Sequence, residues 1–312
     1  MRAYALDHFG EAGSVRDLPA PKPGAGQVLV RVAAAGINPF DAAVVNGFVK
    51  DMMEHHFPLV PGIDASGVVE AVGDGGWNVG DEVFAAVGKM YLGEGTFAEH
   101  ATMSAGTIAR RPASVDRSLV AAMPTAGVTA LTLLDAVAAA DGETLLAIGA
   151  SGGVGSFLVL LAAERGVRVI GVARGEGGEY MRGLGAADVI DYTAGDVSDA
   201  LRSLRPNGID AIVDMVGDKE SVMRLSEQLR SGGRVASAAG GADEAALAER
   251  DIKAANVQTM VTTERLDELA KGFEDGRLKS PQIESVALDQ AAEALARVGS
   301  KHVRGKLVIA VS

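Results

Sequence analysis

The sequence contains no cysteine, which excludes disulfide bonds, thiol nucleophiles and thiolate ligands for zinc. Aromatic residues make up only 4%, and no apolar run is long enough to span a bilayer. Basic residues are also in short supply, since 29 Lys and Arg face 41 Asp and Glu for a formal net charge of -12. Such a surface repels phosphate backbones, so the composition predicts neither a nucleic-acid partner nor a membrane partner.

The composition that remains is typical of a globular protein, with 48% hydrophobic and 22% charged residues. A chain of 312 residues is too long for one ordinary core, so two domains are expected. The stretch 1–7 lacks the apolar core of a signal peptide, which predicts a cytoplasmic protein.

The pattern of apolar residues changes along the chain. Strands are predicted at 27–33, 65–72 and 80–85, so the first third is β-rich. From about Ser118 the helical pattern 120–140, broken by Pro124 and Gly127, leads into short apolar runs that alternate with helix-length segments. The runs are 144–148, 168–172, 189–191, 209–214 and 234–238, and the segments are 154–165, 176–184, 194–204 and 219–229. This alternation is typical of a parallel sheet covered by helices on both faces.

The last part of the chain predicts helices at 265–273 and 290–297 and a closing strand at 305–311. A terminal strand this apolar needs a sheet to join, and we expect it to return to the first domain. The predicted fold class is therefore α/β, with a β-rich domain at 1–118 and 264–312 and a doubly wound, Rossmann-type domain at 119–263.

A glycine-rich turn, Gly149-Ala150-Ser151-Gly152-Gly153-Val154-Gly155, follows the first strand of the second domain and opens a helix. Glycines let the backbone approach a pyrophosphate, and the N–H groups at the helix start then face it. Ala150 departs from the usual pattern, because it stands where Gly-x-Gly-x-x-Gly has its first glycine.

The end of the second strand of this domain predicts the choice of cofactor. Dinucleotide enzymes that use NAD place Asp or Glu there, whereas this chain has Arg174 followed by Gly175, and Arg174 lies 19 positions after Gly155. A guanidinium binds a 2′-phosphate through charge-assisted hydrogen bonds, so NADPH is favoured. Glu176 is the competing signal, since a small backbone shift would bring it to the ribose.

Eight short blocks, in order along nearly the whole chain, resemble the medium-chain dehydrogenase/reductase superfamily, in particular its zinc-free quinone oxidoreductase (zeta-crystallin-like) branch. They are Gly36–Asp41, Pro61–Gly67, Gly80–Val83, Gly95–Glu99, Gly127–Ala130, Gly149–Gly155, Gly185–Tyr192 and Gly305–Val308. The resemblance implies a GroES-like catalytic domain and a Rossmann domain, and pairing of two copies into a homodimer.

The resemblance also implies the residues that contact NADPH. They are Asn38, Thr129, the turn Gly152–Gly155, Arg174 and Tyr192, with Val216, Gly217, Ala238, Ala239, Gly240 and Lys306 lining the nicotinamide side. Asn38 is the candidate catalytic residue, through the carboxamide, the ribose or the acceptor oxygen. We interpret Asp41 as a cap of the following helix.

The zinc branch of the same superfamily carries a cysteine where Asn38 stands and a His-Glu pair where this chain has Ile63-Asp64. Because Asn38 and Ile63 cannot replace a thiolate and an imidazole, no metal is expected. Without a metal the substrate has to spread the incoming charge itself, which favours a quinone or a small α,β-unsaturated carbonyl.

Two alternatives stay open: an enoyl-thioester reductase and a non-enzymatic NADPH-binding protein. Related reductases place tyrosines where this chain has Ala43 and Val49, which argues against the thioester reductase, although Tyr91 is a substitute candidate. The resemblance includes an abundant lens protein that binds NADPH, which keeps the non-enzymatic alternative open.

Overall fold

The computed structural model describes residues 1–74, 76–300 and 302–311, and the chain divides into two compact units. Unit 1 comprises Met1–Val128, Val261–Gly276 and Gln282–Ser312, and unit 2 comprises Thr129–Met260 and Arg277–Pro281. Among the described residues no helix is long and apolar enough to cross a membrane.

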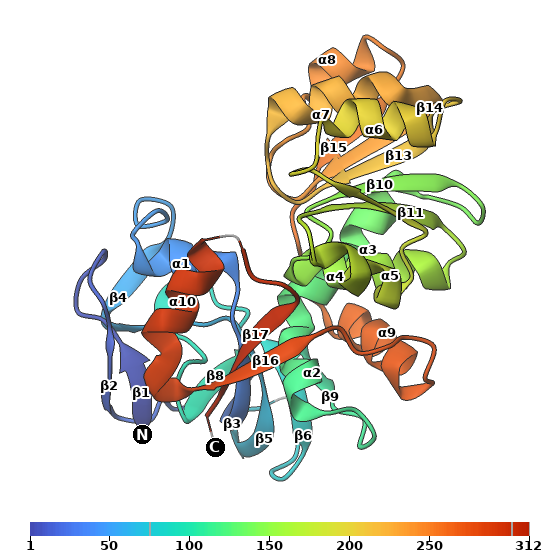
Figure 1. Cartoon of the computed structure of the whole chain (residues 1–312). Helices are drawn as coiled ribbons and strands as arrows, with labels where there is room; N and C mark the ends of the chain where they lie inside the picture. The colour runs from blue at the N-terminus through green and yellow to red at the C-terminus, as the bar shows by residue number, and fades with distance from the viewer. Residues whose placement is uncertain (75, 301, 312) are drawn as a thin grey trace. The chain divides into compact units, whose positions relative to one another are not determined.

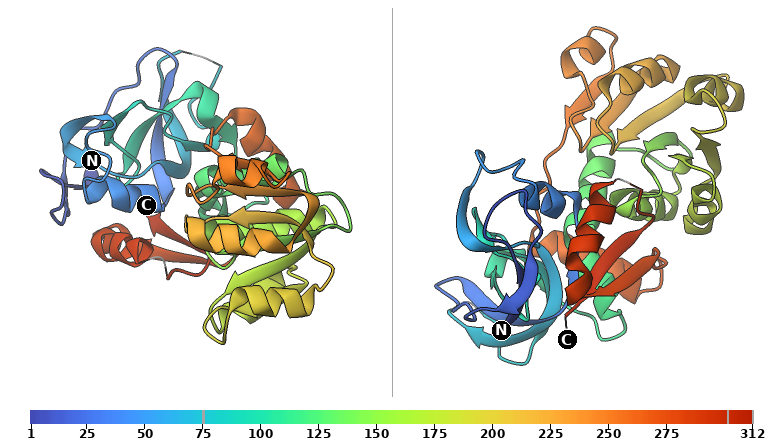
Figure 2. Two further views of the ribbon diagram at one scale, coloured as in Figure 1. Left: turned by 90° about the horizontal axis from the view of Figure 1, so that it is seen from above. Right: turned by 60° about the vertical axis from the view of Figure 1, so that its left-hand side comes forward.

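Unit 1 is built on a seven-stranded sheet whose main path runs β16-β17-β3-β5-β6-β9, with β8 paired to β3. The strands are β3 (Gln27–Gly36), β5 (Asp64–Val72), β6 (Glu82–Ala86), β8 (His100–Ser104), β9 (Ile108–Arg110), β16 (Ile283–Ala287) and β17 (Lys306–Ala310). The expected return of the closing strand is confirmed, because β17 pairs antiparallel with β3 through Val308 and Gly36 (Figures 1 and 2).

Smaller elements complete unit 1. Two short sheets join β1 (Arg2–Ala5) to β2 (Ser14–Asp17) and β4 (Glu54–Val60) to β7 (Tyr91–Glu94), and one 3-10 turn is η1 (Ala105–Thr107). The helices of this unit are α1 (Pro39–Val45), α2 (Arg117–Ala122), α9 (Thr263–Glu274) and α10 (Ala291–Gly299), with η3 (Leu288–Gln290) before the last. Helix α10 packs against α1 beside the sheet (Figure 1).

Unit 2 is a six-stranded sheet in the order β12-β11-β10-β13-β14-β15, parallel throughout. Its strands are β10 (Thr144–Ile148), β11 (Arg168–Ala173), β12 (Asp188–Asp191), β13 (Ile209–Asp214), β14 (Leu229–Ser237) and β15 (Lys253–Asn256). The connections are α4 (Gly153–Glu164), α5 (Gly177–Leu184), α6 (Val197–Leu204), α7 (Lys219–Leu225) with η2 (Ser226–Gln228), and α8 (Glu244–Ala248). Helices α4 and α5 lie on one face and α6 and α7 on the other, which confirms the predicted doubly wound fold (Figure 1).

One local expectation needs correction. The helical stretch after Ser118 breaks before Pro124, between α2 and α3 (Pro124–Val137), but not at Gly127. A Cβ on Gly127 would lie 2.8 Å from the Leu269 side chain, so this glycine serves close helix packing. His55 and His56 lie in β4, because this segment pairs with β7.

Candidate functional site

The candidate cofactor residues of unit 2 gather at one edge of its sheet. In a parallel sheet the carboxyl ends of all strands meet at the same edge. Where the order of the strands along the chain reverses, a crevice opens at this edge. The reversal falls between β10 and β13, which are neighbours in the sheet although β11 and β12 separate them in sequence. Five predicted segments follow the ends of β10 to β14: Gly149–Gly155, Arg174–Gly175, Tyr192, Val216–Gly217 and Ala238–Gly240.

The glycine turn has the backbone geometry that an anion site requires. Gly149 has a φ of 83°, and Gly152 caps α4 without offering a side chain to the first N–H groups of the helix. A Cβ on Gly155 would lie 2.5 Å from the Cα and O of Ala150, so only glycine lets α4 start this close to the turn. Ala150 itself is buried, and its φ is not positive, so the backbone at this position does not require glycine.

The end of β11 carries an exposed cation. Arg174 is exposed, and among the described residues its guanidinium has no ion-pair partner within 4 Å. Tyr192, at the end of the neighbouring β12, is 46% exposed and donates its backbone N–H to the Ala173 carbonyl. Arg174 and Tyr192 thus lie on adjacent strand ends.

A buried hydrogen-bond network shapes the other two loops, and its side chains were not among those predicted from the sequence. The Asp214 carboxylate accepts from the N–H groups of Val216 (2.9 Å) and Gly217 (3.2 Å) and from the Ser237 hydroxyl (2.6 Å). The Ser237 Oγ in turn accepts from the N–H groups of Ala239 (3.1 Å) and Gly241 (2.9 Å). One carboxylate and one hydroxyl therefore fix the loops after β13 and β14 together. The signal available in the sequence was a polar residue at the end of each apolar strand.

Unit 1 holds the second candidate site, at the start of α1. Asn38 is 3% exposed, and its Nδ2 donates to Asp64 Oδ2 (2.9 Å) while its Oδ1 accepts from Lys306 Nζ (2.7 Å). Lys306 also donates to the Ile37 carbonyl (2.7 Å), and Thr125 donates its hydroxyl to Asp64 Oδ1 (2.7 Å). Asparagine thus links a buried ammonium to a buried carboxylate.

Asp41 adds a second buried carboxylate to this network. Its Oδ2 accepts from the Asn38 N–H (2.7 Å), which confirms its predicted role at the start of α1. Burial is the main cause that raises the pKa of Asp41 to about 8, and it raises the pKa of Asp64 as well. Burial also lowers the pKa of Lys306, against the opposing attraction of the two carboxylates. When Asp41 keeps its proton, the negative charge of Asp64 and the positive charge of Lys306 balance each other.

Two predicted cofactor residues have internal partners. The Lys306 ammonium, expected on the nicotinamide side, bonds within unit 1 and is buried. Thr129, which begins unit 2 in α3, has its Oγ1 2.6 Å from Thr259 Oγ1. Contacts of Lys306 and Thr129 with a cofactor stay predictions.

Other candidates of the sequence analysis have local explanations. The Tyr91 hydroxyl donates to Glu94 Oε2 (2.8 Å), and burial with the nearby carboxylate raises the pKa of Tyr91 to about 12. Tyr91 is therefore a poor proton donor at neutral pH.

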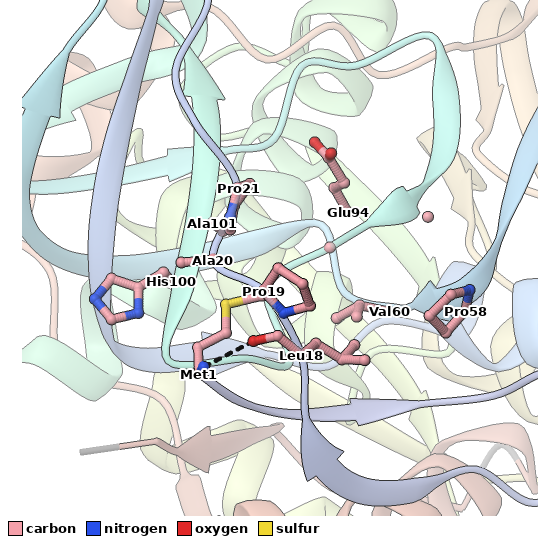
Figure 3. A pocket seen from close by; sticks show the side chains of 12 residues that line it. Met1, Leu18, Pro19, Ala20, Pro21, Pro58, Val60, Glu94, His100 and Ala101 are labelled. Atoms are coloured by element: carbon pink, nitrogen blue, oxygen red, sulfur yellow. Dashed lines mark hydrogen bonds between the residues drawn. The ribbon is translucent and has the colours of Figure 1, made fainter.

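A cavity of about 270 Å³ lies in unit 1 among the side chains of Met1, Leu18, Pro19, Pro58 and Val60 (Figure 3). It contains none of the predicted site residues. Among residues 1–74, 76–300 and 302–311, no three His, Asp or Glu side chains are grouped to hold a metal.

A β-rich domain combined with a six-stranded Rossmann-type domain defines a dinucleotide-binding class of protein, and comparison with known proteins narrows this class. The alcohol dehydrogenase GroES-like domain family matches residues 24–113, and a family described as zinc-binding dehydrogenase matches residues 184–309. A quinone oxidoreductase of Rattus norvegicus is 32% identical over 243 residues, which cover 75% of this chain and 72% of the relative. The chain therefore belongs to the medium-chain dehydrogenase/reductase superfamily, in its quinone oxidoreductase branch.

Other relatives extend the comparison. A mitochondrial NAD(P)H oxidoreductase of Homo sapiens, RTN4IP1, is 33% identical over 210 residues, covering 61% of this chain but only about half (52%) of the relative. A chloroplastic NADPH-dependent alkenal/one oxidoreductase of Arabidopsis thaliana is 28% identical and covers 99% of this chain and 79% of the relative.

Solved structures agree with this assignment over the full length. The quinone oxidoreductase of Coxiella burnetii superimposes with a TM-score of 0.90 at 28% identity, covering 100% of this chain and 99% of that one. A mycobacterial protein solved in complex with NADPH gives a TM-score of 0.85 at 26% identity, with 100% of both chains covered.

Proposed function

We propose that this chain is an NADPH-dependent oxidoreductase that transfers hydride to a quinone or a small α,β-unsaturated carbonyl without zinc. The observation that carries the proposal is the pairing of a glycine-lined helix start with an exposed guanidinium, Arg174, on the next strand end. The relatives named for quinones and for alkenals or alkenones support the substrate class, and the mycobacterial protein solved with NADPH supports the cofactor. In this proposal the domain at 119–263 binds the cofactor and 1–118 with 264–312 forms the catalytic domain.

The residues of unit 2 fit a dinucleotide. The open N–H groups at the start of α4 would receive the pyrophosphate, since Gly152 leaves them without a side-chain cap. Arg174 would bind the 2′-phosphate, with Tyr192 beside it. The loops that Asp214 and Ser237 fix, Val216–Gly217 and Ala238–Gly240, would line the nicotinamide side. When bound, the cofactor supplies the hydride, and the protein positions it against the acceptor.

The chemistry around Asn38 supports a zinc-free reaction. A divalent cation at this position would need anionic or imidazole ligands, but Asn38 offers a neutral amide, and Ile63 offers no ligand at all. The Lys306 ammonium already bonds to Asn38 Oδ1 and neutralises the nearby Asp64. A second cation would be repelled by this ammonium. We propose that Asn38, held by Asp64 and Lys306, orients either the carboxamide of the cofactor or the oxygen of the acceptor.

Substitution of Arg174 tests the cofactor assignment. Arg174→Ala is expected to weaken NADPH binding by about 1.5–3 kcal/mol, the scale of a hydrogen bond to a charged group, and to leave NADH nearly unchanged. Fluorescence titration of both cofactors measures this difference. Arg168→Ala is the matched control, because Arg168 begins the same strand at the opposite edge of the sheet. Equal losses for both cofactors would refute the assignment.

Steady-state assays test the substrate class. We expect turnover of NADPH with a 1,4-quinone and a small enone, and little turnover with a crotonyl thioester. Turnover with the thioester alone would favour an enoyl-thioester reductase, and tight NADPH binding without turnover of any electrophile would favour a non-enzymatic role. A homodimer and a cytoplasmic location belong to the same proposal, and sedimentation and fractionation test them.

A further inference from the structure

Asp191 ends β12 directly beside the predicted 2′-phosphate site. Asp191 pairs in register with Ala173, the residue before Arg174. Its Oδ2 accepts the backbone N–H of Gly175 (3.1 Å), the residue after Arg174. Its Oδ1 accepts both the N–H (2.9 Å) and the hydroxyl (2.7 Å) of Thr193. Three hydrogen bonds thus hold this carboxylate next to Arg174.

We propose that Asp191 is a specificity-determining residue, which opposes the 2′-phosphate and so allows the protein to bind NADH alongside NADPH. The inference rests on the proposed function, because it concerns the same adenosine end of the cofactor site. Its basis is the position of the carboxylate, which pairs in register with Ala173 and accepts the Gly175 N–H, on either side of Arg174 in the sequence.

Two effects of Asp191 act in the same direction. The carboxylate lies close enough to Arg174 for their charges to interact, so it offsets part of the attraction that the guanidinium offers to a phosphate. It also occupies the Gly175 N–H, which is therefore not available as a backbone donor to a phosphate. NADH, whose ribose carries a 2′-hydroxyl, avoids the repulsion and can donate a hydrogen bond to a carboxylate.

Asp191 is ionised under the conditions in which the cofactor binds. The hydrogen bonds from the Thr193 side chain and backbone are the main cause that holds the pKa of Asp191 below its usual range, with a smaller effect from Gly175 and Arg174. Arg174 is the cation whose charge interacts with this carboxylate. The negative charge is therefore fixed in position.

The test compares three variants by fluorescence titration with NADPH and NADH. Asp191→Asn is expected to tighten NADPH roughly 10-fold, the effect of removing one charge a few ångströms from a phosphate, with NADH changed by no more than about twofold. Thr193→Val removes a hydrogen bond to the carboxylate but keeps its charge. Asp199→Asn removes an equal charge from an exposed position on α6. Both controls are expected to leave the NADPH-to-NADH ratio within about twofold of the wild-type ratio.

Each result separates this inference from the proposed function. An unchanged ratio in Asp191→Asn, or an equal shift in Thr193→Val, overturns the role of Asp191 while the binding of both cofactors leaves the proposed function standing. Failure of the wild-type protein to bind either cofactor overturns both. A wild-type protein that binds NADPH but no NADH also overturns the inference, because the carboxylate would then permit no second cofactor.

Discussion

The buried carboxyl of Asp41 makes the stability of unit 1 depend on pH in an unusual direction. Most carboxylates stabilise a fold in their ionised form, but Asp41 is fully buried and its pKa is raised from 3.8 to about 8. Between these values the unfolded chain has released the proton that the folded chain still holds. The free energy of unfolding therefore falls as the pH rises through this window, and it is highest below the pKa of the unfolded state.

The size of the effect follows from the width of the window. Each pH unit in which unfolding releases one proton lowers the free energy of unfolding by about 1.36 kcal/mol. From pH 5 to 8 the wild-type protein should lose about 4 kcal/mol relative to Asp41→Asn. The amide resembles the protonated acid in shape and its oxygen can still accept from the Asn38 N–H. The difference between the two proteins reports the proton of Asp41 together with its interaction with Asp64.

Denaturant unfolding of both proteins at pH 5, 6, 7 and 8 measures this difference. Trp77 is the sole tryptophan of the sequence and lies in unit 1, so its fluorescence reports on the unit that contains Asp41. Asp7→Asn is the control. The pKa of Asp7 is lowered, chiefly by its hydrogen bond from Arg16, so this carboxylate stays ionised in both states over the same range. A wild-type minus Asp41→Asn difference that does not change with pH would refute the reasoning.

Three further predictions concern positions that the structure constrains. Gly155→Ala should destabilise unit 2 by about 1–3 kcal/mol and weaken cofactor binding, because its Cβ would meet Ala150, whereas Gly183→Ala on α5 meets open space and should be neutral or stabilising in the same thermal unfolding assay. Ser237→Ala should cost about 1–3 kcal/mol, measured by denaturant titration, since two N–H groups and Asp214 lose a partner. Lys306→Met should cost about 3–5 kcal/mol because it leaves the Asp64 carboxylate buried without its cation, and the added change Asp64→Asn should recover part of this loss.

The fold could be predicted largely because its signals are local. The strands β10 and β13 have the predicted bounds, since short apolar runs between helix-length segments identify buried parallel strands. The strand β15 escaped prediction, because Lys253–Asn256 is polar at both ends and lies at the edge of the sheet. The short strands β1, β2, β4 and β7 were also missed. Their pairing depends on partners elsewhere in the chain rather than on their own pattern.

The candidate site could be predicted only in part. The glycine turn and Arg174 carry their chemistry in a few consecutive residues, so the sequence was sufficient to single them out. Asp191 was not singled out as a site residue, because its importance arises from pairing between β11 and β12 and from contact with a backbone N–H 16 positions away. The same holds for Asp214 and Ser237, which are 23 positions apart.

The network around Asn38 shows how charge balance bears on the reaction. Asn38 joins Asp64 and Lys306, which lie 26 and 268 positions away along the chain, so no local pattern could place these groups together. If Asp41 keeps its proton, Asp64 and Lys306 neutralise each other, and the amide of Asn38 is held between opposite charges. Adding a divalent cation would place it beside an ammonium that is already bonded, whereas a neutral acceptor oxygen adds no positive charge. In the function proposed above, the Lys306 ammonium beside Asn38 would suit an acceptor oxygen that gains negative charge, as the oxygen of a quinone or an enone does.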